Sequence, residues 1–378
     1  MKYYAVVMGD WHFNSLGLIR SLGERGVPVV YLNMSEGGYG EHSRYTVKTY
    51  HSSDSIYEEL LKVLDENEGT AVIFPSCDKA ALLLDEKHGE LQGRCIVPNL
   101  GGNAKKYMDK QAMCAIAEKS GFNVPACIKV NLNEKTYEEI KEFGFPCIIK
   151  PLLSVEGIKA DISVCGNCDE LEKAIEVFNS SGNAYKQVLV QRFVHGTENL
   201  MVGYCGCKVR KKRVLLYGQL EKTREYPIDR GSTSYAVIKK DTPFVDIDAL
   251  NAFLERVGFE GLFDIDIKVV DNIPYFIEIN FRNGAISYAF TAAGFNIPYT
   301  WYCEMTCQKV DPIEIRELLL MCERDDLNHV KDKNISIFKW LHDIRRTDVF
   351  MLHNRNDPQP FVQAYGKAVS RVLDILRK

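Results

Sequence analysis

Two stretches of alternating polar and apolar residues, separated by a short turn, contain side chains that could bind a metal or a phosphate. Successive side chains of a β-strand point to opposite faces, so polar residues at every second position share one face. The polar positions of stretches 261–270 and 275–282 are Asp264, Asp266, Lys268, Glu278, Asn280 and Arg282. The apolar positions expected on the opposite face are Phe263, Ile265, Ile267, Ile277, Ile279 and Phe281. The pattern predicts an antiparallel hairpin with one polar face.

The register of this hairpin decides whether the polar face can bind a metal. A three-residue loop at 271–273 would pair Val270 with Pro274 and place Asp266 directly opposite Glu278. Opposed residues have Cβ atoms roughly 4.5–5.5 Å apart, where two like charges destabilise a sheet unless a cation lies between them. Two carboxylates and the amide of Asn280 suit Mg²⁺, which completes its shell with phosphate oxygens. A two-residue loop would shift the pairing by one position and spoil the site.

Two arginines are candidates for contact with the reacting groups. Arg282 shares the polar face and offers a rigid cationic fork to a phosphate or an acyl phosphate. Arg224 lies in the polar stretch 223–233 and could orient a substrate carboxylate through a bidentate contact, although a surface loop explains it equally well. The hairpin itself could be an ordinary solvated face of mixed charges. The clustering of carboxylates, amide and guanidinium favours the functional interpretation.

The first hundred residues alternate between strand and helix signals. Strands are expected at 3–8, 28–32, 71–74 and 95–97, and a helix is expected at 15–25. Strands separated by helices indicate a parallel, Rossmann-like sheet, in which ligands bind beyond the carboxyl ends of the strands. The stretch from Gly9 to Gly17 does not match G-x-G-x-x-G, so the signal for a dinucleotide is weak.

The remainder of the chain changes pattern twice. One helix is expected over 105–120, and the segment that follows contains helices at 137–143 and 170–178 and strands at 146–150 and 160–164. From residue 188 to residue 283 the chain is mostly strands joined by turns. Residues 311–378 mix helix with short strands and contain no motif.

The order of several motifs between residues 109 and 294 resembles the ATP-grasp superfamily. Glu278-Ile279-Asn280-Phe281-Arg282 resembles its E-x-N-x-R strand for metal and phosphate, although Phe281 replaces a proline that is often found there. Asp266 lies where the superfamily has its other magnesium carboxylate. The resemblance implies ATP and Mg²⁺, or Mn²⁺, as cofactors.

The resemblance also implies which residues bind the nucleotide. Lys110, next to Asp109 at the start of a helix, and Lys150, at the end of an apolar strand, would hold the phosphates. A lysine at such a strand end often only reaches toward solvent. The loop that covers the phosphates would include Ser154 and Gly157, with fewer glycines than many relatives have. The hinge residues implied by the stretch 188–198 are Gln191, Phe193 and Val194 for adenine, the last two through their backbone, and Glu198 for the ribose hydroxyls.

The implied fold combines α/β and α+β parts. A Rossmann-like pre-ATP-grasp domain at 1–104 would precede the two-lobed ATP-grasp domain, with a small lobe at 105–185 and a large lobe with the metal hairpin at 186–310. A C-terminal extension at 311–378 would follow. The finer likeness is to D-aspartate ligase and carbamoyl-phosphate-synthase-like proteins. It implies a carboxylate–amine ligase that forms an acyl phosphate, with Arg282 and Arg224 at the reacting groups. A non-catalytic nucleotide sensor and a nicotinamide-dependent dehydrogenase remain alternatives.

The composition agrees with a soluble globular enzyme. Of the 378 residues, 46% are hydrophobic and 26% charged, and the formal net charge of −4 offers no field to attract nucleic acid or an anionic membrane. No run of about 18 apolar residues predicts a membrane span, and the start of the chain lacks the features of a signal peptide. We therefore expect a cytoplasmic protein with small-molecule carboxylate and amine substrates, and a homodimer through the first domain is one option. The spacing of Cys165 and Cys168, followed by Cys205 and Cys207, leaves zinc binding open.

Overall fold

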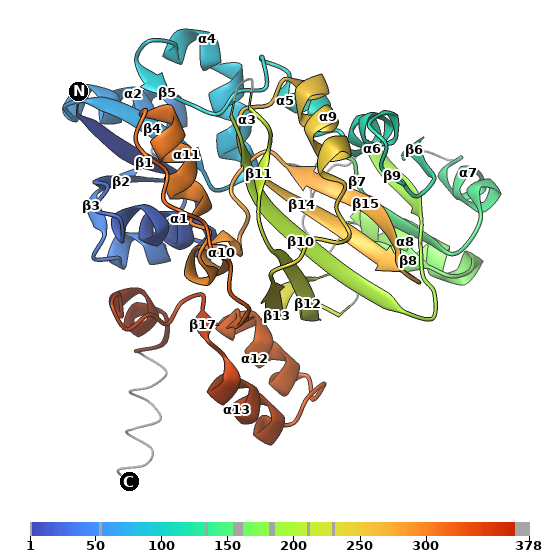
Figure 1. The fold of residues 1–378 in the computed structure, drawn as a ribbon. Helices are drawn as coiled ribbons and strands as arrows, with labels where there is room; N and C mark the ends of the chain where they lie inside the picture. The colour runs from blue at the N-terminus through green and yellow to red at the C-terminus, as the bar shows by residue number, and fades with distance from the viewer. Residues whose placement is uncertain are drawn as a thin grey trace.

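The computed structural model describes residues 2–52, 55–132, 135–153, 162–180, 186–209, 212–228 and 231–366. Within these residues the strands form three sheets, of five, four and eight strands. The eight-stranded sheet occupies the centre of the molecule, between the N-terminal sheet and the four-stranded sheet (Figure 1). The predicted combination of α/β and α+β parts is confirmed. No helix among the described residues has both the length and the apolar content that a membrane crossing requires.

The N-terminal sheet is parallel, with the strand order β3-β2-β1-β4-β5. Its strands are β1 (Tyr3–Gly9), β2 (Val29–Asn33), β3 (Thr46–His51), β4 (Thr70–Pro75) and β5 (Cys95–Ile96). Its helices are α1 (Phe13–Gly23), the 3₁₀ helix η1 (Tyr39–His42), α2 (Ile56–Glu66), α3 (Asp78–Glu86) and α4 (His88–Leu91). Sequence analysis missed β3 because this edge strand buries only Tyr50 and has no apolar run.

The four-stranded sheet has the order β6-β9-β7-β8 and is antiparallel. Its elements and the two preceding helices are α5 (Ala104–Tyr107), α6 (Lys110–Lys119), β6 (Cys127–Asn131), α7 (Thr136–Phe143), β7 (Cys147–Pro151), β8 (Ser163–Cys165), α8 (Cys168–Ser180) and β9 (Gln187–Arg192). The single helix predicted over 105–120 is two helices. Asp109 separates them because its carboxylate accepts the N–H groups of Gln111 and Ala112 and so begins a new helix.

The eight-stranded sheet has the order β15-β14-β10-β12-β13-β16-β17, with β11 paired to β10. Its strands are β10 (Asn199–Lys208), β11 (Leu215–Leu216), β12 (Gln219–Tyr226), β13 (Ser232–Lys239), β14 (Gly261–Val270), β15 (Ile273–Asn280), β16 (Leu318–Met321) and β17 (Val349–Phe350). Its helices are α9 (Ile247–Val257), α10 (Ser287–Ala293), α11 (Ile297–Met305), α12 (Glu323–Lys331) and α13 (Ile337–Arg346). The tail predicted as an extension thus contributes β16 and β17 to the central sheet.

Burial on one face of β14 determines which face carries the carboxylates. Phe263, Ile265 and Ile267 are at most 1% exposed and pack with residues of α9, whereas Asp264 and Asp266 are half-buried on the other face. A one-residue slip would turn these apolar side chains toward the opposite face, at a cost of about 1.5–3 kcal/mol for each side chain that became exposed. The apolar positions therefore hold the polar face in place.

Asp266 pairs with Glu278 as predicted, but the turn of the hairpin differs from the predicted turn. Its turn has two residues, Asp271 and Asn272, which both have positive φ (48° and 63°), as in the twisted turns that suit hairpins. Val270 therefore pairs with Ile273, and the predicted three-residue loop is wrong. A β-bulge then adds Ile277 to the second strand, which restores the pairing of Asp266 with Glu278. Sequence analysis placed Ile277 on the apolar face of the hairpin. The bulge instead turns this side chain toward a cleft, which it lines.

Candidate active site

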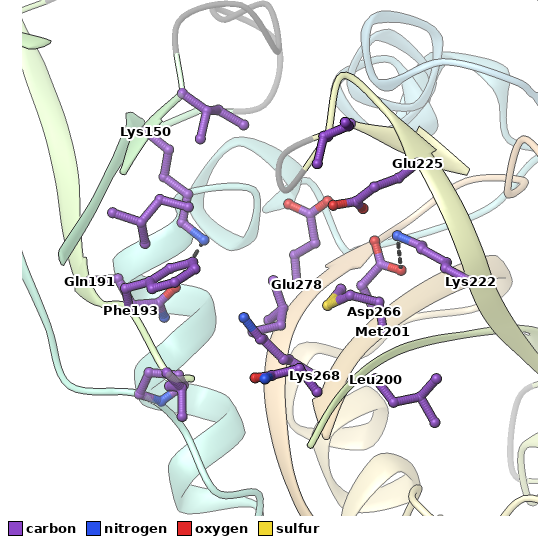
Figure 2. A pocket seen from close by; sticks show the side chains of 18 of the residues that line it. Lys150, Gln191, Phe193, Leu200, Met201, Lys222, Glu225, Asp266, Lys268 and Glu278 are labelled. Carbon is purple, nitrogen blue, oxygen red and sulfur yellow. Dashed lines mark hydrogen bonds and ion pairs between the residues drawn. The ribbon is translucent and has the colours of Figure 1, made fainter. Parts of the chain in front are cut away.

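A cleft of about 690 Å³ lies between the four-stranded sheet and the central sheet. Figure 2 shows Lys150, Gln191 and Phe193 on one wall, Lys222, Glu225 and Asp266 on the other, and Glu278 between them. Pockets for small ligands commonly measure roughly 300–1,000 Å³, so the cleft has room for a nucleotide. Residues from both lobes and from the hairpin converge on this one space.

The predicted metal ligands meet at the floor of the cleft. Asp266 is the cross-strand partner of Glu278, and Asp264 is the partner of Asn280. Burial, and to a smaller extent the neighbouring Asp266 carboxylate, raises the pKa of Asp264 to about 6.

The donor atoms of these residues fit a magnesium ion. Among the described residues, no three His, Cys, Asp or Glu side chains are placed to hold a metal. Two opposed carboxylates and the Asn280 amide supply oxygen ligands that Mg²⁺ accepts, and phosphate oxygens would complete its coordination. The residues therefore fit a magnesium ion that binds together with a nucleotide.

Two lysines face the cleft from the side of the four-stranded sheet. Lys150 is 6% exposed and donates to Oε1 of Gln191 over 2.9 Å. Lys110, the first residue of α6, is 8% exposed, and its burial lowers the pKa of its ammonium group. Burial removes the water that would otherwise stabilise these two ammonium groups. Phosphate groups in the cleft would replace that water with charged hydrogen bonds, so the two lysines suit a phosphate site.

Sequence analysis missed two charged residues of β12. Nζ of Lys222 lies 3.3 Å from Oδ1 of Asp266, and Glu225 points toward Glu278 (Figure 2). Burial lowers the pKa of Lys222, but the negative charges of Asp266 and Glu225 raise it by more than burial lowers it. The pKa of Lys222 therefore lies above its ordinary value. Register shifts between Lys222 and Glu225 interrupt the alternation of β12. The sequence pattern therefore held no signal for these two side chains.

Arg282 lies beyond β15 and lines the cleft. Its Nε donates to Asp78 over 3.1 Å, and its Nη1 lies 3.7 Å from Asp264. Burial lowers the pKa of Arg282, but the carboxylates of Asp78, Asp264 and Glu278 raise it above its ordinary value. Arg282 thus links the carboxyl end of β4 to the metal hairpin.

Arg224 also lines the cleft, but its guanidinium group binds two carboxylates of the protein itself. Its Nε and Nη2 donate to Asp326 over 2.9 and 2.8 Å, and its Nη1 donates to Asp343 over 2.7 Å. The guanidinium also lies 4.3 Å from the ring centre of Tyr235. The bidentate contact predicted for a substrate carboxylate is therefore made with Asp326. Arg224 instead fastens α12 and α13 to the central sheet.

The hinge between the lobes differs in detail from the prediction. Gln191 lines the cleft, but its side-chain oxygen accepts from Lys150. Phe193 and Val194 also line the cleft, and the N–H of Phe193 donates to the Pro146 carbonyl. Glu198 is exposed and is not among the described residues that line the cleft, which removes support for its predicted contact with ribose.

The loop implied to cover the phosphates cannot be compared with the prediction. Ser154 and Gly157 both lie outside the described residues.

No protein-family model matches the chain. It is 22% identical over 227 residues to the formate-dependent phosphoribosylglycinamide formyltransferase of Wolinella succinogenes, which covers 60% of this chain and 57% of that protein. It is 26% identical over 173 residues to the D-alanine–D-alanine ligase of Flavobacterium psychrophilum, covering 43% and 51%. The chain thus spans about half the length of these relatives.

The fold is shared with N5-carboxyaminoimidazole synthetase from Staphylococcus aureus, whose structure was solved in complex with ADP. The TM-score is 0.69, with 13% sequence identity, and the superposition covers 88% of this chain and 86% of that one. The fold, the order of the motifs and these relatives agree: the chain has the fold of ATP-grasp proteins and resembles ATP-dependent ligases in sequence.

Proposed function

We propose that the protein is an ADP-forming ligase that activates a substrate carboxylate as an acyl phosphate and couples it to an amine. The observation that carries the proposal is the pairing of Asp266 with Glu278 in a cleft that also contains the buried cations of Lys110 and Lys150. This arrangement offers oxygen ligands to a metal and positive charge to phosphates within one space.

The nucleotide would lie between the lobes. Lys110 and Lys150 would bind its phosphates, with Gln191 positioning the Lys150 ammonium group. The Phe193 carbonyl and the Val194 N–H are backbone groups that could meet the edge of adenine. Magnesium, held by Asp266, Glu278 and Asn280, would supply charge neutralisation at the phosphates.

The chemistry requires no protein nucleophile. A carboxylate oxygen of the substrate attacks the γ-phosphorus, and the bond from that phosphorus to the bridging oxygen of ADP breaks. The amine nitrogen then attacks the acyl carbon, a C–N bond forms, inorganic phosphate leaves and the nitrogen loses a proton. Lys222 and Arg282 would stabilise the negative charge that develops on the reacting oxygens, because both are cations on the wall of the cleft.

For the substrates, we propose an amino acid or a peptide-like carboxylate and a small amine, as a protein similar to D-aspartate ligase would use. The likeness to a D-alanine–D-alanine ligase supports this class. The division of the chain at residues 1–104, 105–185 and 186–310 belongs to the same proposal, with each part supplying one wall or end of the cleft.

The proposal is tested by incubating the purified protein with Mg-ATP, pooled carboxylic acids and pooled amines while ADP and phosphate are measured. We expect equal amounts of both products, released only when a carboxylate is present. In addition, ATP labelled with ¹⁸O at the β,γ-bridge should scramble the label when the carboxylate is supplied without an amine. Formation of AMP and pyrophosphate would contradict the acyl-phosphate route. If the protein binds ATP tightly but no pool yields ADP, the alternative of a non-catalytic nucleotide sensor would be favoured.

A further inference from the structure

Two cysteine side chains lie against Gln191, a residue of the cleft wall, and the proposed reaction does not use them. Cys114 belongs to α6, and Cys127 is the first residue of β6. Cys127 is the cross-strand partner of Gln191, so these two side chains share one face of the four-stranded sheet. Nε2 of Gln191 donates to Sγ of Cys114 over 3.7 Å, which places the Cys114 sulfur over the same face. The two sulfur atoms therefore meet beside one glutamine.

The thiols of Cys114 and Cys127 are hydrogen-bonded to each other. This bond is the largest cause that raises the pKa of Cys114 above its ordinary value and lowers the pKa of Cys127 below it. Burial raises the pKa of Cys127, but the positive charge of Lys150 adds to the lowering, and the net shift is downward. A lowered pKa increases the fraction of thiolate, which is the form that attacks an oxidant. Cys127 is therefore the more reactive sulfur of the pair.

The two cysteines also differ in exposure. Cys127 is half-buried, so a small oxidant can reach its sulfur, whereas Cys114 is only 4% exposed. Redox-sensitive cysteines typically combine an accessible sulfur of low pKa with a second thiol that resolves the first product into a disulfide. Cys127 meets the first requirement, and Cys114 is placed to meet the second.

A second pair of thiols in the same sheet lacks this exposure. Cys147 in β7 and Cys165 in β8 are cross-strand partners, and their thiols are hydrogen-bonded to each other. Both residues are 0% exposed and belong to the hydrophobic core that the sheet forms with α7 and α8. A dissolved oxidant does not reach these sulfur atoms in the folded protein, so this pair is an internal comparison for the first.

A bond between Cys114 and Cys127 would act on both lysines of the proposed phosphate site. Gln191 joins the two sites, because its Nε2 donates to Cys114 and its Oε1 accepts from Lys150 over 2.9 Å (Figure 2). Movement of the Cys114 sulfur toward Cys127 would break its contact with Gln191 and release the Lys150 ammonium group from its position. Cys114 also lies one helical turn after Lys110 in α6, so a covalent bond to β6 would displace the start of this helix.

We propose that Cys114 and Cys127 form a reversible disulfide that weakens the binding of ATP, so that the redox state of this pair regulates the enzyme. The inference rests on the proposed nucleotide site. By linkage, bound nucleotide must oppose the disulfide by the same factor by which the disulfide weakens nucleotide binding.

The oxidant is a low-molecular-weight disulfide such as oxidised glutathione. The Cys127 thiolate attacks one sulfur atom of this disulfide, a mixed disulfide forms, and one glutathione thiolate leaves. The Cys114 thiol then loses its proton and attacks the Cys127 sulfur, and the second glutathione leaves. The two protein sulfurs thus lose two electrons, and these electrons and the two cysteine protons convert one glutathione disulfide into two glutathione thiols.

The disulfide and its effect are measured separately on the full-length protein. The protein is equilibrated in glutathione buffers of increasing oxidised fraction, and the remaining thiols are then blocked with N-ethylmaleimide in denaturant. Peptide mass spectrometry should find Cys114 joined to Cys127, with Cys147 and Cys165 alkylated. Calorimetric titration with Mg²⁺ and a non-hydrolysable ATP analogue should give a Kd about tenfold or more higher for the oxidised protein, because Lys150 loses a positioning hydrogen bond. Dithiothreitol should restore the lower Kd, a check that needs no variant.

Cys127→Ser cannot form the bond and should bind the analogue equally well in oxidising and reducing buffer. Cys307→Ser, which changes an exposed cysteine, is the matched control and should lose affinity on oxidation as the parent protein does. The proposal is overturned if Cys114 and Cys127 are not joined, if Cys147 and Cys165 are joined in their place, or if Cys127→Ser also loses affinity on oxidation.

The same titrations distinguish failure of this inference from failure of the proposed nucleotide site. If the reduced protein binds the analogue and the disulfide leaves the Kd unchanged, the inference alone is refuted. If the reduced protein does not bind the analogue, the nucleotide site itself is refuted and the inference with it.

Discussion

Asp266 and Glu278 are cross-strand partners on neighbouring strands, so their negative charges repel each other. Asp264 adds a third carboxylate close by, and Lys222 lies within 3.3 Å of Asp266. The ammonium group of Lys222 forms an ion pair with Asp266, and Glu278 points toward Glu225 (Figure 2). A magnesium ion that arrives with the nucleotide would lie between the Asp266 and Glu278 carboxylates and reduce their repulsion.

Glu278→Gln should reduce ADP release by about 100-fold or more, because it removes charge that holds the metal at the transferring phosphate. It should also abolish the thermal stabilisation by Mg-ATP, which is about 2.7 kcal/mol for a ligand at 100 times its Kd. Thermal shift assays with and without Mg-ATP measure this. Glu138→Gln, on the exposed face of α7, is the control. Retention of both properties in Glu278→Gln would show that the metal lies elsewhere.

Lys150→Met should raise the KM for ATP by roughly ten- to a hundredfold, since a hydrogen bond to a charged group contributes about 1.5–3 kcal/mol. Gln191→Leu should cause a smaller rise, because it frees the ammonium group that Gln191 positions. Steady-state kinetics at a saturating carboxylate concentration measure both. The exposed Lys129 of β6 offers the control Lys129→Met. An unchanged KM in Lys150→Met would remove this lysine from the phosphate site.

At the scale of secondary structure elements, α12 and α13 are fastened to the cleft by buried charges. Asp326 is 0% exposed and accepts from Arg224 and from Ser234, and Asp343 is 2% exposed and accepts from Arg224 and Lys339. Because Arg224 lies between the cleft and these helices, the tail of the chain can determine the shape of the substrate end of the cleft.

Asp326→Ala should lower the free energy of unfolding by about 3–5 kcal/mol, because it leaves the largely buried Arg224 without its bidentate partner. Urea denaturation followed by circular dichroism gives this value. Asp311→Ala breaks a pair with Arg25 in which both side chains are about half exposed, and such pairs contribute about 0–1 kcal/mol. Equal losses in the two variants would mean that the contact of Asp326 with Arg224 does not fasten the helices.

At the scale of the whole molecule, the tail and the hairpin are both joined to the N-terminal domain. Arg20 in α1 and Asp357 near the end of the described chain form an ion pair of 2.9 Å in which both side chains are fully buried. The Asn14 amide donates to the carbonyls of Ser76 and Asn283, which ties the ends of α1, β4 and the hairpin together. The relative position of the sheets, and so the width of the cleft, depends on such contacts.

Asp357→Ala should cost about 3–5 kcal/mol of unfolding free energy, because it leaves the Arg20 guanidinium buried and unpaired on one side. Hydrogen exchange should increase first in residues 349–366, which lose their attachment to α1. The exposed pair of Arg94 with Asp65 supplies the control Asp65→Ala. Unchanged exchange in 349–366 would show that other contacts hold the tail.

Local sequence determined most of the elements and the chemical character of the site. Alternation with period two identified both arms of the hairpin, and the capping carboxylate of Asp109 marks the start of α6. The motif order from Lys110 to Arg282 resembles the ATP-grasp superfamily, and this resemblance implied a nucleotide. The metal hairpin was predicted from side-chain types and spacing, whereas the residues for the nucleotide were implied by the resemblance.

Only the tertiary structure decided the register and the partners of the charged groups. The bulge at Ile277 compensates for the short turn, and no periodicity in the sequence marks it. Arg224 meets Asp326 and Asp343, which lie 102 and 119 residues further along the chain, and Trp11 meets Arg324 across 313 residues. Long-range ion pairs and cavity walls depend on how sheets and helices pack, and a local pattern of residue types carries no information about distant partners.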